Sequence, residues 1–199
     1  MLGTIIGLLT QPKVAWGKLA EKSDAQLRPY LILPVILGLI PTIAWNYGTT
    51  QIGWSIGDSD PTKLAEESAR FIAVIYYFTQ LAAVYCMGYF IHWMAETYEA
   101  ESTPLKGFAV AACVVTPALL ISVVGVYPNF ALDFLIGLLV VSYTVYLLYT
   151  GIPIMMKVPA ERGFLYASAI VAIGLVVIVI MMVGTVIIWD VGFAPAFVD

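Results

Sequence analysis

The sequence contains a single histidine, and two glutamates follow it at helical spacing. His92, Glu96 and Glu99 occur in YFIHWMAETYEAE, residues 89–101. Residues four and seven positions apart share a face of an α-helix, so we expect these three side chains to lie together. Neutral imidazole and carboxylate groups bind metal ions and carry protons. The stretch therefore predicts a candidate metal or proton site, which would need further ligands from another helix.

Asp133 is a fourth candidate, because an ionisable group at membrane depth is a functional candidate by default. It follows Pro128 by five residues, in the first turns of a predicted helix, where the helix dipole favours a negative charge. A simpler interpretation also exists for the histidine stretch: Trp93 marks the membrane interface and the glutamates are solvated. Both interpretations, an ion site and polar residues at helix ends, are carried forward.

The elements that must position these residues are membrane-spanning helices. Hydrophobic residues make up 61% of the chain and charged residues 11%, whereas soluble domains are about 45 to 50% apolar and about 25% charged. The mean hydropathy is +0.94. About 20 apolar helical residues cross a bilayer, and charge-poor runs of this kind occur near residues 30–47, 70–95, 105–127, 130–153 and 164–189. Continuous rather than alternating runs favour helices over a barrel, so we predict an all-α bundle of five transmembrane helices.

The basic residues are distributed unevenly between the two sides that five spans create. Of the nine, only Lys63 and Arg70 fall on one side. The other seven share the opposite side, namely Lys13, Lys18, Lys22, Arg28, Lys106, Lys157 and Arg162. The positive-inside rule then predicts a cytoplasmic amino terminus and an external carboxyl terminus. The predicted organisation is a cytoplasmic segment at 1–29, a membrane domain at 30–189 and a short external tail at 190–199.

The amino-terminal segment predicts a short amphipathic helix that starts at Pro12, since proline favours the first helical position. Its apolar side comprises Ala15, Trp16 and Leu19, and two lysines lie on the other side. We expect this helix to lie in the cytoplasmic interface, with its apolar side toward the lipid and its lysines toward anionic headgroups. It would serve either as a topology anchor or as a surface for a protein partner.

Four prolines interrupt the predicted spans: Pro34, Pro41, Pro117 and Pro153. Each removes a backbone donor and kinks its helix. Neighbouring helices can satisfy the freed carbonyls, and polar residues such as Thr79 and Gln80 can supply interhelical hydrogen bonds. Broken helices build binding sites in transporters, but kinks also occur in membrane proteins that transport nothing.

Signatures of enzymes and of nucleic-acid-binding proteins are missing from the sequence. It has no HExxH, G-x-S-x-G, P-loop or dinucleotide-binding motif. It also has no basic cluster interleaved with aromatic residues. We therefore predict no catalytic residue, no cofactor and no nucleic-acid partner.

Three stretches together resemble the bacterial branch of the Yip family, relatives of the Ypt- and Rab-interacting membrane proteins of the eukaryotic secretory pathway. They are LLTQPKVAWGKLAE near the amino terminus, VVTPALL in the third span and YTGIPIMMKVPAER at the end of the fourth. The motif residues matched in this way are Pro12, Trp16, Pro117, Tyr149, Gly151, Pro153, Lys157 and Pro159.

The last of these stretches predicts a helix exit and packing corner. Gly151 permits close approach of another helix, and Pro153 breaks the fourth helix at the cytoplasmic interface. Lys157 snorkels to headgroups, and Pro159 stops the helix before a short turn into the fifth span. Packing and partner binding are both open as roles of this motif.

The resemblance implies a five-helix membrane protein with a cytoplasmic amino terminus, in agreement with the charge distribution. In eukaryotic members it implies roles in vesicle trafficking through Rab GTPases. This sequence lacks their long cytosolic amino-terminal region and their Asp-Leu-Tyr-Gly-Pro type motif, so Rab binding is not predicted. The family supplies no catalytic residues to carry over.

Two main functions are carried forward, and a membrane enzyme that works with scattered acidic residues is a third, less favoured option. The first is a non-enzymatic, multi-pass protein of the bacterial inner membrane. It would act through membrane lipids, other membrane proteins or a homo-oligomer in membrane or envelope organisation and trafficking-like processes. The alternative is a transporter or channel for a small ion or metal that uses His92, Glu96, Glu99 and Asp133.

Overall fold

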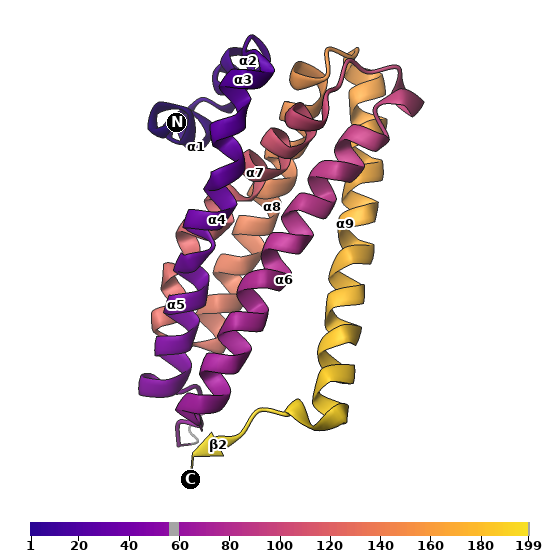
Figure 1. The fold of residues 1–199 in the computed structure, drawn as a ribbon. Helices are drawn as coiled ribbons and strands as arrows, with labels where there is room; N and C mark the ends of the chain where they lie inside the picture. Colours follow the sequence, from indigo (N-terminus) through magenta and orange to yellow (C-terminus); the bar gives the residue numbers. More distant parts are fainter. Residues whose placement is uncertain (56–59, 199) are drawn as a thin grey trace.

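The computed structural model describes residues 1–55 and 60–198. Asp199, which belongs to the predicted external tail, lies outside these residues. The described residues contain five helical stretches that are long and apolar enough to cross a membrane: Asp24–Ile52, Glu66–Trp93, Pro104–Val126, Phe130–Met155 and Ala160–Phe193. Successive stretches run in opposite directions in one bundle (Figure 1). The prediction of an all-α bundle with five spans is confirmed.

Two short helices precede the first of these stretches and lie at one end of the bundle (Figure 1). They are α1 (Leu2–Thr10) and α2 (Pro12–Ala20). As predicted, α2 starts at its proline, whose missing N–H is not needed in the first turn. The helix α1 was not predicted from the sequence. Side-chain hydroxyls anchor it: Tyr143 Oη donates to the Leu8 carbonyl at 2.6 Å and to the Leu9 carbonyl at 3.3 Å, and Thr4 Oγ1 lies 2.8 Å from Tyr30 Oη.

The first span is broken into short pieces. It consists of α3 (Asp24–Leu27), a 3-10 turn over Arg28–Ile32, α4 (Leu33–Leu37), α5 (Leu39–Tyr47) and a wider turn over Gly48–Ile52. Its neighbour α6 (Glu66–Trp93) supplies hydrogen-bond donors to the carbonyls of these pieces. Tyr85 donates to Leu31 at 2.7 Å, Tyr77 to Val35 at 2.9 Å and Gln80 to Gly38 at 2.7 Å. A neighbouring helix therefore bonds carbonyls of the broken span. These are not the carbonyls of Tyr30 and Leu37, which lie four residues before Pro34 and Pro41 and lose a donor to the prolines.

The central helix of the bundle is α7 (Pro104–Ile121), in which ten residues are buried. Many of them are small, and α6 and α7 approach closely where Gly88 faces Phe108. Small residues at such crossings allow close packing of membrane helices. A 3-10 turn over Ser122–Val126 then leads to α8 (Phe130–Met155), which returns along the bundle.

The last helix, α9 (Ala160–Ile188), packs on the bundle in its first half and diverges from α6 in its second half (Figure 1). A wider turn follows over Trp189–Phe193, and the chain then crosses back so that β2 (Phe197–Val198) pairs antiparallel with β1 (Lys63–Leu64). The rings of Phe71 and Phe193 stack at 5.2 Å beside this pairing. The side chains of the second half of α9 are apolar and exposed, as expected for a lipid-facing helix.

Candidate functional site

Motif residues from α2 and from the end of α8 meet at one buried tryptophan. The Trp16 side chain is 0% exposed, and a Cβ built on Gly151 would lie 2.6 Å from its ring. The indole therefore packs directly on the backbone of α8, which only glycine permits. We call this site the Trp16 corner, made up of Pro12, Trp16, Tyr149, Gly151, Pro153, Lys157 and Pro159.

The Trp16 corner also joins α8 to α9. A Cβ on Gly163 would lie 2.8 Å from Pro153, so α9 packs on the proline ring through a glycine. The hydroxyls of Tyr149 and Ser168 are hydrogen-bonded at 2.7 Å. Pro159 immediately precedes the first residue of α9, with extended backbone. The expected close helix approach at Gly151 is present. The expected helix stop is not: α8 continues through Pro153 and ends at Met155, four residues before Pro159, and Pro159 instead marks the start of α9.

The turn between α8 and α9 is held by two ion pairs to the loop after α6. Lys157 has a positive φ of 52°, and its ammonium lies 2.8 Å from the Glu101 carboxylate. Arg162 pairs with Glu99 at 2.6 Å. The hydrogen bond and charge of Lys157 hold the pKa of Glu101 below its usual value. Lys157 was expected to snorkel to headgroups, whereas its ammonium has a protein carboxylate as partner.

The apolar side of α2 does not face lipid, which corrects the sequence-based expectation. Ala15, Trp16 and Leu19 are all buried in the hydrophobic core. A helix of nine residues presents its apolar side to whatever covers it, and sequence periodicity does not distinguish lipid from another helix. Here the other helix is α8.

The histidine stretch does not form one helical face, because α6 ends at Trp93. Glu96 starts a separate 3-10 turn over Glu96–Tyr98, and Glu99 has a left-handed φ of 51°. His92 Nδ1 lies 3.1 Å from Ser102 Oγ. His92 and Glu96 both line a shallow pocket of about 440 Å³, but Glu99 is directed to Arg162. The prediction of three side chains on one face is therefore wrong, because the helix stops one residue after the histidine.

Asp133 lies at the opposite end of the bundle from His92. Its Oδ2 accepts a hydrogen bond from the Asn129 amide at 3.0 Å, and Asn129 Oδ1 accepts one from the Leu132 amide at 3.0 Å. Asp133 is thus part of the amino-terminal cap of α8. The 18 residues of α7 connect the two ends and extend about 27 Å.

The four candidate ligands are therefore not brought together. Among residues 1–55 and 60–198, no group of three or more His, Cys, Asp or Glu side chains is placed to hold a metal ion. Pro117 is also remote from the Trp16 corner. It is buried in the second half of α7, thirteen residues from the start of that helix.

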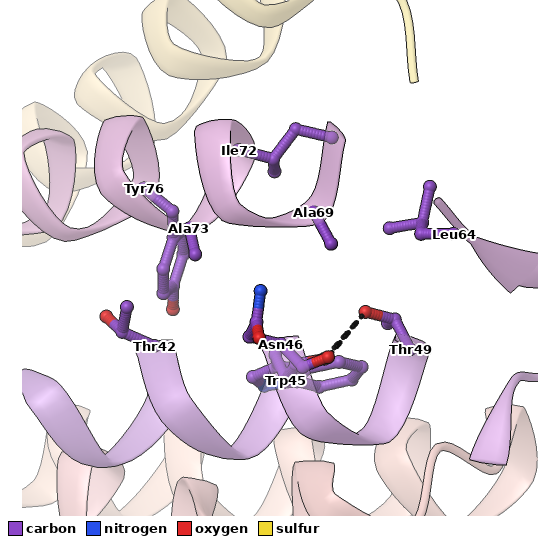
Figure 2. A pocket seen from close by; sticks show the side chains of 9 residues that line it. All are labelled: Thr42, Trp45, Asn46, Thr49, Leu64, Ala69, Ile72, Ala73 and Tyr76. Carbon is purple, nitrogen blue, oxygen red and sulfur yellow. Dashed lines mark hydrogen bonds between the residues drawn. The ribbon is translucent and has the colours of Figure 1, made fainter. Parts of the chain in front are cut away.

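A groove between the first two spans was not predicted. This α5–α6 groove has a volume of about 440 Å³ and is lined by Thr42, Trp45, Asn46, Thr49, Leu64, Ala69, Ile72, Ala73 and Tyr76 (Figure 2). The Asn46 amide nitrogen is buried and has no hydrogen-bond partner in the described part of the chain. The only signal in the sequence was an asparagine in an apolar stretch.

The chain is similar to known membrane proteins over most of its length. The model of the Yip1 domain matches residues 6–181. Proteins called "Inner membrane protein YohC" from two strains of Escherichia coli are each 34% identical over 187 residues, which covers 94% of this chain and 96% of theirs. No solved structure matches the chain.

Proposed function

Because the chain belongs to the Yip1 domain family, we propose that it is a non-enzymatic multi-pass protein that acts through protein or lipid partners in membrane or envelope organisation. The bacterial relatives are named as inner membrane proteins, which supports the same location here. The distribution of basic residues supports a cytoplasmic amino terminus and an external carboxyl terminus.

One observation carries this proposal: the side chains of the Trp16 corner are used for packing. Trp16 is buried against α8, Tyr149 is hydrogen-bonded to Ser168, and Lys157 forms an ion pair with Glu101. No nucleophile with an adjacent base occurs among these residues, and such a pair is what covalent catalysis requires.

The corner instead builds a surface. Beside it lies α1, anchored by Tyr143 and Tyr30, with Leu2, Ile6 and Leu9 exposed. These side chains form an apolar face, beside a helix that carries lysines. Exposed apolar patches on one side of a protein mark interaction surfaces for proteins or membranes. A partner would contact this face of α1, next to the Trp16 corner.

The test is purification from the native membrane in nanodiscs, followed by mass spectrometry of co-purifying proteins and lipids. We expect a stoichiometric partner with the wild type and its loss in Ile6→Ser/Leu9→Ser. Both residues are exposed, so the fold should survive. Leu175→Ser is the control, because Leu175 is at least as exposed as Ile6 and Leu9 but lies on α9.

The proposal fails if the wild type carries no stoichiometric partner or if the purified protein moves a solute across liposomes at a substantial rate. The second outcome would favour the transporter alternative. A single ion site built from all four candidate ligands is not formed, since Asp133 and His92 lie at opposite ends of the bundle.

A further inference from the structure

We propose that the α5–α6 groove binds an ester-linked acyl chain of a membrane glycerophospholipid, with the Asn46 amide donating a hydrogen bond to the ester carbonyl. This names a lipid partner and so rests on the lipid part of the proposed function. The groove lies at the end of the bundle opposite to the Trp16 corner, so the two proposals can fail separately.

The groove opens to lipid rather than to water. Both of its walls belong to stretches that can cross a membrane. Ile43 and Val74, which follow the lining residues Thr42 and Ala73 in the sequence, are 64% and 56% exposed. The space exists because Ala69 and Ala73 present small side chains to α5 (Figure 2). Its volume of about 440 Å³ lies in the range of ligand pockets, about 300 to 1,000 Å³. In a bilayer, such a space is filled by the surrounding hydrocarbon chains.

Among the described lining residues, Asn46 carries the buried polar atom that has no partner, and Tyr76 adds a hydroxyl to the groove. The hydroxyls of Thr42 and Thr49 donate to carbonyls of their own helix at 2.8 and 2.7 Å. The Asn46 amide nitrogen has no such partner among the described residues, and its side chain is directed toward α6 between Ala69 and Ala73 (Figure 2). A buried donor without an acceptor is unfavourable. The occupant must therefore offer an acceptor.

The depth of Asn46 matches the ester region of a lipid. Ala69 and Ala73 lie three and seven residues after Glu66, the first residue of α6, or about 5 and 11 Å along the helix. This is near the border between the headgroups and the roughly 30 Å hydrocarbon core, where glycerol ester carbonyls occur. An ester carbonyl accepts hydrogen bonds and donates none, which is what the amide requires. None of the described residues that line the groove is a cation, so a free carboxylate would lack a counter-charge from them.

The experiment measures phospholipid retained by the full-length protein in detergent, by native mass spectrometry after extraction from nanodiscs of phosphatidylethanolamine and phosphatidylglycerol. We expect one tightly retained diacyl phospholipid in the wild type. Asn46→Leu removes the donor and Ala73→Phe fills the groove, and each should reduce retention at least fivefold. Val74→Phe adds the same ring on the exposed side of α6 and should leave retention unchanged.

A second comparison tests the hydrogen bond itself. A diether phospholipid with the same headgroup has no ester carbonyl, so it should be retained severalfold less than the diester by the wild type. In Asn46→Leu the two lipids should be retained equally. Lipid-free Asn46→Leu should also unfold at a higher temperature than the lipid-free wild type, because it lacks the buried unpartnered amide, and this shows that the variant folds.

Equal retention in wild type, Asn46→Leu and Ala73→Phe would overturn the proposal. Equal retention of diester and diether lipids by the wild type would overturn the assigned hydrogen bond. If Ala73→Phe instead dissociated an oligomer without changing the lipid count, the groove would be an interface between copies of the chain, and the lipid assignment would be wrong.

Discussion

At the scale of single residues, the closest contact of the Trp16 corner is between an indole ring and a glycine. The two residues are 135 positions apart in the sequence, and a Cβ on Gly151 would lie 2.6 Å from the ring. Glycine here is a requirement of packing rather than of backbone conformation, since the residue is helical.

Gly151→Ala should therefore destabilise the protein. Overpacking a close contact costs about 1 to 3 kcal/mol, because the indole is buried and has no free space to move into. Unfolding in mild detergent, followed by tryptophan fluorescence, measures this. Gly137→Ala is the control on the same helix, because its Cβ would meet nothing within 4 Å. Equal stability of the two variants would contradict the packing argument.

The Glu101–Lys157 pair should make stability depend on pH at acidic values. Lys157 lowers the pKa of Glu101 from its ordinary value of 4.5, so the carboxylate binds protons less readily in the folded state. The contribution is present above pH 4.5 and is lost as the pH falls through the lowered pKa. Both side chains are more than half exposed, so the effect should be small and salt-sensitive.

The measurement is the difference in unfolding temperature between wild type and Glu101→Gln. The wild type should be slightly more stable at neutral pH and low salt, and the two should converge at acidic pH and in high salt. A difference that grew on acidification would refute this assignment of the pair.

At the scale of elements, the first span depends on α6 for its backbone hydrogen bonds. The prolines break it into α4 and α5, and side chains of α6 bond its carbonyls at Leu31, Val35 and Gly38. The first span and α6 therefore form one cooperative unit. A regular helix would bond these carbonyls with its own backbone, whereas here α6 supplies the donors.

Tyr85→Phe should weaken this unit by about 0.6 kcal/mol, and at most about 1.7 kcal/mol, the range measured for hydrogen bonds between membrane helices. The substitution removes only the hydroxyl that donates to Leu31 at 2.7 Å. Tyr89→Phe is the matched control one turn further along, where the tyrosine is 55% exposed. Hydrogen exchange of the first span should rise in Tyr85→Phe alone; similar exchange in both variants would contradict the coupling.

At the scale of the whole molecule, the two ends of the bundle differ in chemistry. One end carries α1, α2, the Trp16 corner and the two ion pairs. The other carries the β1–β2 pairing and the α5–α6 groove. The charge distribution predicts that the first end is cytoplasmic.

Single cysteines in a Cys86→Ala background test this orientation in intact cells, with Cys113 buried and protected. Ala194→Cys should react with a membrane-impermeant maleimide added outside, because it follows the last span. Lys18→Cys should react only after the membrane is permeabilised. The reverse pattern would invert the proposed topology.

The spans and the start of α2 were predictable because their causes are local. Apolar runs of sufficient length must be helical in lipid, and a proline at the first turn starts a helix. The motif around Gly151 and Pro153 also predicted a packing corner. The separation of His92 and Asp133 could also be predicted, because it follows from the order of the spans. The end of α6 at Trp93 could not, and it places Glu99 outside the predicted helical face.

The sequence by itself thus determined the five spans, their order and a basic side suited to the cytoplasm. Only the tertiary structure decided that Trp16 packs on Gly151, that α2 covers α8, and that Asn46 faces a groove. The physical reason is that lipid is as apolar as the interior of the helix bundle, so hydrophobic periodicity does not mark the helix faces that pack together. Those faces are chosen by shape, small residues and hydrogen bonds between segments far apart in the chain.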